Sequence, residues 1–278
     1  MSFVHLQIST AYSLLSSTVS IHKLIEKAKK LNYHALAITD RNVLYGVVPF
    51  YKECVKNNIK PIIGLTIDVI SEINQEQSYP LVLLAKNKKG YENLLKLSST
   101  IQTKSKQGIP LKWLRGYRSG LFAFTPGLKG EIEQYLLNGD NEAAKEVAVT
   151  FKNLFEKDSF FFSLQNHGLP EEKKLIEQLI ELGYKYEIKQ IVTNDVQYID
   201  KEDAFSHECL MAIRENQKLS DDERPKLMSE EYYLKDKESI AEDFAAYIDA
   251  LENTILVAEA CHVQREMNSK LLPKFPVP

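Results

Sequence analysis

The feature that most constrains the fold is an alternation of short apolar runs with amphipathic helical patterns. Residues 35–39 and 59–64 are typical of buried strands, and residues 47–55 between them carry apolar side chains at helical spacing. Similar pairs of segments follow, so that the chain gives about seven strand–helix steps. This alternation predicts a parallel sheet, and the number of steps favours a barrel over an open sheet.

The pattern changes after Asp200, where the strand-like runs stop. Residues 204–213 and 248–261 are predicted to be helical, and the chain then becomes rich in proline. We therefore predict an α/β domain with a barrel core over residues 1–200 and a helical part of the same domain over residues 201–270. Residues 271–278 are predicted to be a linker.

The opening segment alternates apolar and polar side chains, which predicts a strand with two unlike faces. The ends of barrel strands are where α/β enzymes collect functional groups, so we expect the polar face to reach the barrel mouth. The apolar members are Val4, Leu6 and Ile8, and the polar members are His5, Gln7 and Ser9.

Composition excludes several classes of protein. The net charge of −3 predicts neither an acidic protein nor one that coats nucleic acid. Three widely separated cysteines without a CxxC motif favour reduced thiols, and we see neither a signal peptide nor a membrane span. These features predict a cytoplasmic protein. No GxGxxG, GxxxxGK[ST] or GxSxG motif occurs.

Asp40, His167 and Asp195 each follow a predicted strand, at the edge where a barrel enzyme would hold a metal. A hydrolytic metal centre needs several such ligands, and the adjacent Arg41 would repel a divalent cation. We favour the alternative, in which the two aspartates end their strands and bond their own loops.

A stretch without acidic residues, 93–130, has the most uneven charge distribution of the chain. Basic and aromatic side chains interleave there, which favours contact with a nucleic-acid backbone or a partner. The alternative is a solvated loop with Trp113 packed beneath it, and the two remain open. The candidate contact residues are Lys104, Lys106, Lys112, Trp113, Arg115, Tyr117 and Arg118.

Several strings together resemble one family. They are FVHLQISTAYS at 3–13, ALAITD at 35–40, KPIIG at 60–64, LVLLAKN at 81–87, LQNHGLP at 164–170 and VTNDVQY at 192–198. They resemble the PHP (polymerase and histidinol phosphatase) domain, and more closely the N-terminal domain of DnaE-type alpha subunits of bacterial DNA polymerase III. The resemblance covers essentially the whole chain and implies a distorted seven-stranded (β/α) barrel.

The resemblance also identifies the positions that hold metal ligands in metal-binding members of the family. Asp40, His167 and Asp195 keep residues able to bind a metal, and the other positions do not. The resemblance therefore implies a degenerate metal site, with no metal and no catalytic residue in this fragment. The positions are Gln7, Ser9, Ser16, Asp40, Arg41, Thr66, Pro80, Gly127, His167, Asp195 and Gln197.

The implied function is that of a structural domain in a replicative DNA-directed DNA polymerase, a nucleotidyltransferase at the level of the full-length parent. Magnesium is implied for the full polymerase and no cofactor for this fragment. The implied partners are the palm and thumb of the same chain, primed template DNA and other replisome subunits. The alternative is a free-standing metal-dependent phosphoesterase or proofreading exonuclease of the same family.

One contact pattern is expected within the former metal cavity. Gln7, Ser9, Arg41 and Gln197 are expected to hold it together by hydrogen bonds and by charge pairing with Asp40 or Asp195.

Overall fold

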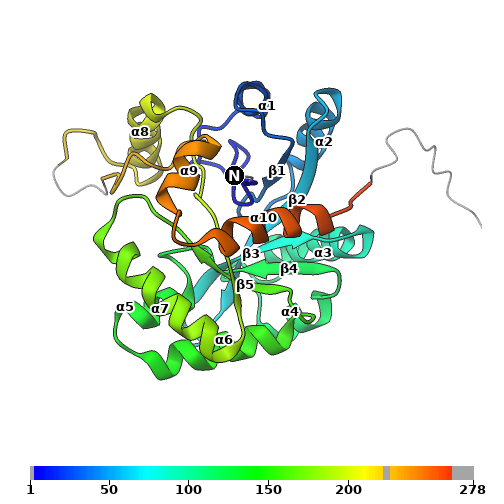
Figure 1. Ribbon diagram of the computed structural model, residues 1–278, viewed down its shortest axis with the longest axis vertical. Helices are drawn as coiled ribbons and strands as arrows, with labels where there is room; N and C mark the ends of the chain where they lie inside the picture. The colour runs from blue at the N-terminus through cyan, green and yellow to red at the C-terminus, as the bar shows by residue number, and fades with distance from the viewer. Residues whose placement is uncertain (1–2, 222–225, 265–278) are drawn as a thin grey trace, which may run out of the picture.

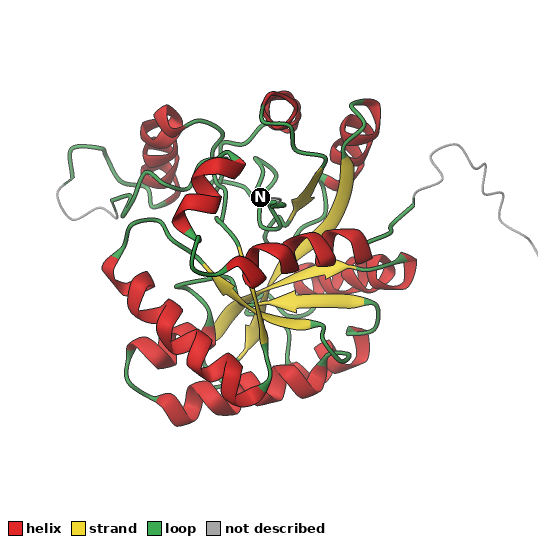
Figure 2. Cartoon of the chain, viewed as in Figure 1, coloured by secondary structure: helices red, strands yellow, loops and turns green. Residues whose placement is uncertain are grey.

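The computed structural model describes residues 3–221 and 226–264, in which helices surround a mixed sheet (Figures 1 and 2). The sheet has six strands in sequence order and curls into a half-barrel. Each strand lies where an apolar run predicts one. The strands are β1 Ala35–Ile38, β2 Lys60–Ile70, β3 Ser78–Ala85, β4 Leu121–Phe124, β5 Phe160–Leu164 and β6 Lys189–Val192.

The predicted seventh strand is wrong. Among the described residues the opening segment forms only an isolated bridge, between Ile8 and Val196. Its hydrogen bonds go to two different neighbours: Ala37 N–H donates to His5 O at 3.0 Å, and Ser9 N–H donates to Val196 O at 2.9 Å. Because these bonds are divided, no continuous ladder forms, and the sheet is a six-stranded half-barrel in place of the expected seven-stranded barrel.

The predicted parallel sheet also needs correction. β3 runs antiparallel to both β2 and β4, whereas the other neighbouring strands are parallel. The connection between β2 and β3 spans only residues 71–77, which is too short for the crossover that a parallel pair needs. Pro80 pairs with Asp68 of β2 beyond the part of β3 that contacts β4, so β4 does not need its missing N–H.

The helices pack against the sheet because each presents an apolar side to it. In the first helix, for example, Leu24, Ile25 and Ala28 are buried at helical spacing. The helices are α1 Ile21–Lys30, α2 Val47–Lys56, α3 Lys88–Thr103, α4 Leu111–Tyr117, α5 Glu131–Leu137, α6 Asn141–Leu154, α7 Pro170–Tyr186, α8 Ala204–Arg214, α9 Lys237–Asp243 and α10 Ile248–Ala260, with a 3-10 turn at Lys201–Asp203.

The hydrophobic core has two parts, one on each side of the sheet. The larger packs between the strands and helices such as α2, whose Phe50 is fully buried. The smaller contains alternate strand residues, among them Ile62, Leu84 and Phe124, together with Val257 of α10. Because alternate strand residues point to opposite sides, strands that are apolar throughout bury both of their faces.

Helix α10 lies across one end of the half-barrel, which we call the α10 end (Figure 1). Lys60 Nζ, at the start of β2, donates to Ala258 O and Glu259 O in the last turn of the helix, at 2.7 and 3.1 Å. His262 N–H donates to Lys86 O, directly after β3, at 2.7 Å. The opposite end, where the parallel strands finish, is the mouth.

The part of the chain after β6 is helical, as the sequence predicts, with α8, α9 and α10 in succession. The predicted linker at 271–278 lies outside the described residues. Within the described ranges, every helix is too short or too polar to span a bilayer.

Candidate functional site

A polar pocket with a volume of about 100 Å³ opens at the mouth. It brings together most of the positions that the resemblance assigns to a metal centre. These are Gln7, Ser9, Ser16, Arg41, Thr66, Pro80, Asp195 and Gln197, and Ser13, Pro126, Lys129 and Arg214 complete the lining. Asp40, Gly127 and His167 lie outside that lining.

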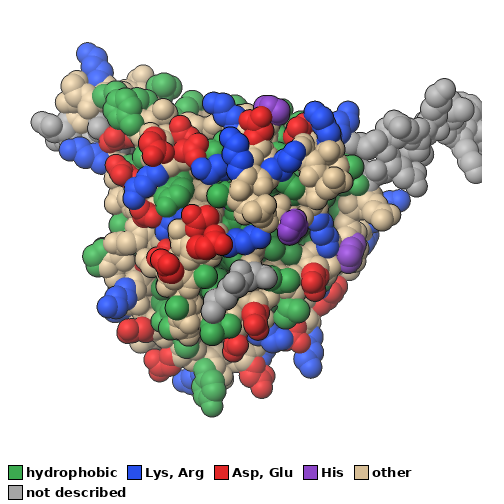
Figure 3. Space-filling view, turned by 45° about the horizontal axis from the view of Figure 1, so that its top comes forward, with side chains coloured by type: hydrophobic (Ala, Val, Ile, Leu, Met, Phe, Trp, Pro, Cys, Tyr) green, Lys and Arg blue, Asp and Glu red, His purple; other side chains and the backbone are tan. Residues whose placement is uncertain are grey.

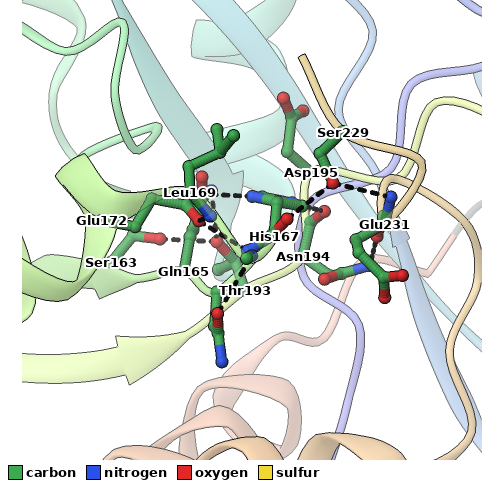
Figure 4. Close-up of polar contacts among 12 residues, drawn as sticks. Ser163, Gln165, His167, Leu169, Glu172, Thr193, Asn194, Asp195, Ser229 and Glu231 are labelled. Carbon is green, nitrogen blue, oxygen red and sulfur yellow. Dashed lines mark hydrogen bonds and ion pairs between the residues drawn. The ribbon is translucent and has the colours of Figure 1, made fainter. Parts of the chain in front are cut away.

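The lining residue Gln7 belongs to a buried network of neutral groups centred on Gln165, which we call the floor (Figure 4). Gln165 Nε2 lies 2.8 Å from Thr193 Oγ1, 3.0 Å from Pro126 O and 3.2 Å from Gln7 Oε1. Thr193 Oγ1 donates to Gln7 Oε1 at 3.1 Å and lies 2.5 Å from Ser163 Oγ. These amides and hydroxyls are buried. Substituting one of them by an apolar residue would therefore leave a neighbouring polar atom without a hydrogen bond.

Gln165 has a structural role that sequence reasoning did not assign. The alternation of side chains along β5 could have indicated this role, because it places Gln165 on the same side as Phe161 and Ser163. Gly127 makes room for it: a Cβ on this glycine would lie 1.9 Å from Gln165 Oε1, and its φ of +92° also favours glycine. The Gln165 amide therefore fills the space beside Gly127, one of the positions that the resemblance assigns to the metal site.

Asp40 is buried behind the pocket and fully engaged. Its Oδ1 accepts from Thr10 N–H at 2.6 Å and from Ser13 Oγ at 2.7 Å, and its Oδ2 accepts from Thr10 Oγ1 at 2.8 Å. Burial raises the pKa of the Asp40 carboxyl, and the hydrogen bonds from Ser13 and Thr10 oppose that shift. The expectation that Asp40 bonds its own loop is wrong, because its partners come from the turn after the opening segment.

His167 does not line the pocket, and its ring contacts other protein groups (Figure 4). Its Nδ1 lies 2.5 Å from Glu172 Oε1, and its Nε2 lies 2.7 Å from Asn194 O. Its ring stacks on Tyr232, with centroids 4.0 Å apart. Both ring nitrogens therefore face acceptor atoms of the protein, and neither offers a lone pair to the pocket.

Asp195 and Arg41 do line the pocket. Gln197 Nε2 donates to Asp195 Oδ2 at 2.9 Å, as expected from the sequence. Arg41 does not pair with Asp40 or Asp195 as expected: its Nη2 donates to Asp68 Oδ1 at 2.7 Å and its Nε to Asp68 Oδ2 at 3.3 Å. Asp68 is available because β2 continues past the point where its neighbour β1 ends.

The lining is predominantly cationic. It holds Arg41, Lys129 and Arg214 against the single carboxylate of Asp195. Lys129 and Arg214 were not expected at the site, since neither comes directly after a predicted strand. Nearby on α8, burial lowers the pKa of His207 to about 4, and the positive charge of Arg214 adds to this effect.

These donors do not fit the divalent metal centre that the resemblance associates with metal-binding relatives. Residues 3–221 and 226–264 contain no group of three or more His, Cys, Asp or Glu side chains placed to hold a metal ion. The pocket offers one carboxylate with neutral hydroxyls and amides, and three cations oppose a divalent ion.

The basic and aromatic candidates lie on a different surface. Lys104 and Lys106 follow α3, while Lys112, Trp113 and Arg115 lie on α4, a helix where the sequence was read as a loop. Trp113 is 36% exposed, so it is not packed beneath this segment. Tyr117 lies with its ring 5.8 Å from Lys96 Nζ, and Arg118 ends the helix. None of these candidates lines the pocket.

Elsewhere the surface carries charges of both signs. Figure 3 shows acidic and basic side chains interspersed over the face it presents. This mixture agrees with the net charge of −3.

Residues 5–167, from the opening segment to the buried histidine, match the family model of the PHP domain. The chain belongs to the PHP domain family. The match includes the pocket positions contributed by the first five strands and their connections.

Relatives of this PHP domain align with it along its whole length. The DNA polymerase III subunit alpha of Bacillus subtilis is 42% identical over 278 residues, which are 100% of this chain and 25% of that protein. The corresponding subunit of Treponema pallidum is 36% identical over 289 residues, with 100% of this chain and 25% of that protein covered. The chain thus spans a quarter of the length of these relatives.

Solved structures are more distant from this PHP domain. An amidohydrolase from Chromobacterium violaceum superposes with a TM-score of 0.49 and 8% identity, over 71% of this chain and 88% of that chain. A likeness this remote does not bear on function.

Proposed function

We propose that this chain is the N-terminal PHP domain of an alpha subunit of bacterial DNA polymerase III, and that the full-length protein is a DNA-directed DNA polymerase. The observation that carries this proposal is the alignment of the whole chain with polymerase subunits four times its length. Nucleotidyl transfer, and the magnesium it uses, belong to the remainder of the protein.

Within that protein, the domain is proposed to be structural, with a degenerate metal site. A metal-activated water needs a metal held by several ligands with one open coordination position. The polar atoms of Asp40 and His167 are hydrogen-bonded to protein groups. Asp195 is therefore the acidic group in the pocket. The proposed partners are the palm and thumb of the same chain, primed template DNA and other replisome subunits, in the cytoplasm.

Primer extension by the full-length protein tests this function. With magnesium and a primed template, the protein should extend the primer, and Asp195→Asn should extend it at the same rate. The rival function is a manganese-dependent phosphoesterase or exonuclease. Hydrolysis of a phosphoester or of a DNA 3′ end that is stimulated by manganese and abolished in Asp195→Asn would establish that rival and refute a degenerate site.

A second proposed role concerns the basic surface on α4. Lys112, Arg115 and Arg118 are exposed, and their span carries no acidic side chain, which favours a contact with the phosphate backbone of DNA. Reversing all three to Glu in the full-length protein should weaken primed-template binding and reduce its salt dependence. Reversal of the exposed Lys173, Lys174 and Lys185 of α7 is the matched control. Equal affinity for both triple variants would refute the contact.

A further inference from the structure

We propose that a groove beside α6 binds a lysine side chain from a basic peptide segment of a partner protein. The groove has two adjoining parts, which share Ile73, Glu146 and Thr150. The outer part is a hollow of about 540 Å³ over the first turns of α6, and the inner part is a niche of about 20 Å³ lined in part by Glu131 of α5. Neither part shares a lining residue with the pocket at the mouth.

The first argument is the charge of the niche. Its lining contains the carboxyl groups of Glu72, Glu131 and Glu146 and no cationic side chain. In the described part of the chain, none of the three forms an ion pair, and Lys145 of the outer part is already paired with Glu142 at 2.8 Å. A cation from outside the domain is therefore the complementary ligand. It is not a metal ion, because the described residues hold no group of three or more side chains placed to bind one.

The second argument is the burial of Glu131. This residue is 6% exposed, and its Oε1 is buried without a hydrogen-bond partner in the described ranges. Burial raises the pKa of its carboxyl, the nearby Ser71 hydroxyl opposes the shift, and the negative charge of Glu72 adds to it. A buried carboxylate oxygen without a donor costs free energy. An ammonium group that donates to this oxygen would remove that cost and neutralise the charge.

The third argument is the size of the niche. A volume of about 20 Å³ accommodates one group of the size of a water molecule. The compact ammonium group of lysine has that size, whereas the planar guanidinium of arginine is larger. The wall is apolar: Ile73, in the connection between β2 and β3, is 43% exposed, and Val147 and Phe151 of α6 lie beside it. The methylene groups of a lysine side chain pack well on such a surface.

The outer part of the groove favours a peptide over a free amine. Its volume exceeds what one amine needs and leaves room for the residues that flank the lysine. Its further carboxylates, Asp140 and Glu142, have partners in their own helix: Asp140 Oδ1 accepts from Ala143 N–H at 3.0 Å, and Glu142 is paired with Lys145. They make the hollow less suited to an acidic segment without taking part in the niche, so the expected partner segment is basic.

The test measures the fluorescence anisotropy of a labelled hexalysine peptide with the full-length protein, at about 0.15 M salt to screen distant charges. Glu131→Gln should weaken binding at least about tenfold, because it removes the buried partner of the ammonium group. Glu146→Lys should have a similar effect, because it places a competing ammonium group in the groove. Glu146 is exposed, so this variant tests the site even if Glu131→Gln does not fold. Glu177→Gln, on the exposed face of α7, is the matched control and should bind like the parent.

Three results would overturn the lysine site. Absence of hexalysine binding to the parent is the result expected if the rest of the full-length chain fills the groove. Equal affinity in the parent and in Glu146→Lys would assign the binding to charge spread over the surface. Binding of a hexaarginine peptide as tightly as hexalysine would refute a niche of the size of an ammonium group. Primer extension by Glu146→Lys should match that of the parent, so a failure here is separate from a failure of the proposed function.

Discussion

The two ends of the half-barrel differ in how they are held together. At the α10 end, an apolar helix packs on the strands, and Lys60 binds the carbonyl groups of its last turn. At the mouth, neutral amides and hydroxyls form the floor, and cations surround the opening. The first end is therefore held by apolar packing, while the second is organised around polar groups that hydrogen bonds hold in place.

The largest expected effect is at the α10 end. Leu251→Ala removes a side chain that is 1% exposed and should lower the free energy of unfolding by about 3 kcal/mol, through lost burial and the cavity left behind. Chemical denaturation of the full-length protein, followed by a probe of this domain, measures the loss. Leu256→Ala on the same helix is the control, because Leu256 is 61% exposed and should cost less than about 0.5 kcal/mol. Equal effects would mean that burial of its apolar side does not hold α10 in place.

The next largest effect is a pH dependence of the free energy of unfolding, which comes from Glu133 near the pocket floor. Glu133 is fully buried, and burial raises the pKa of its carboxyl to about 7, although the nearby Thr125 hydroxyl opposes the shift. A carboxyl whose pKa is higher in the folded state destabilises the fold as pH rises from the unfolded value, near 4.5, through 7.

Glu133→Gln should therefore stabilise the protein by about 2–3 kcal/mol at pH 8 and have little effect at pH 4. Unfolding curves at both pH values measure the difference, and Glu177→Gln on the exposed face of α7 is the control. A gain of the same size at both pH values would contradict the assignment, because the effect would then not come from ionisation.

A smaller effect is expected from the floor of the mouth. Gln165→Ala should cost about 1–2 kcal/mol, since it leaves Gln7 and Thr193 without a shared partner in a buried place. Gln107→Ala, at an exposed position, is the control for loss of an amide. Thermal unfolding of both variants makes the comparison. If Gln165→Ala is as mild as Gln107→Ala, water replaces the amide and the floor is not a fixed network.

The smallest effect on stability is predicted for Asp195→Asn. Among the described residues its carboxylate makes one hydrogen bond, to Gln197, and it lies in the pocket lining, so the free energy of unfolding should change by less than about 0.5 kcal/mol. Thermal unfolding of the variant beside the parent measures the change. A loss above about 1 kcal/mol would contradict this prediction, because Asp195 would then be held by more than the bond to Gln197.

The sequence predicts the strands well because a strand buried on both faces is a continuous apolar run. The apolar runs do not predict the antiparallel direction of β3, which depends on the short connection at residues 71–77. They also do not predict that the opening segment forms no strand. There, alternation of side chains is present, but the hydrogen bonds are divided between two neighbours.

The site was partly predictable for a similar physical reason. The parallel strands end at the same edge of the sheet, so the side chains at their ends lie close together. This arrangement brings Gln7, Thr66 and Asp195 into one pocket. The orientation of Asp40 and His167 depends on partners such as Thr10 and Glu172, which the strand pattern does not identify. Lys129 and Arg214 reach the pocket from a loop and from the end of α8, where periodicity carries no positional information.

The central claim is that the pocket at the mouth no longer holds a metal. The most direct measurement is the metal content of the full-length protein, purified without chelators after growth with added zinc and manganese, beside its Asp195→Asn variant. The account predicts no stoichiometric zinc or manganese attributable to this domain, and equal metal content in both proteins. One or more equivalents of metal that Asp195→Asn removes would contradict it.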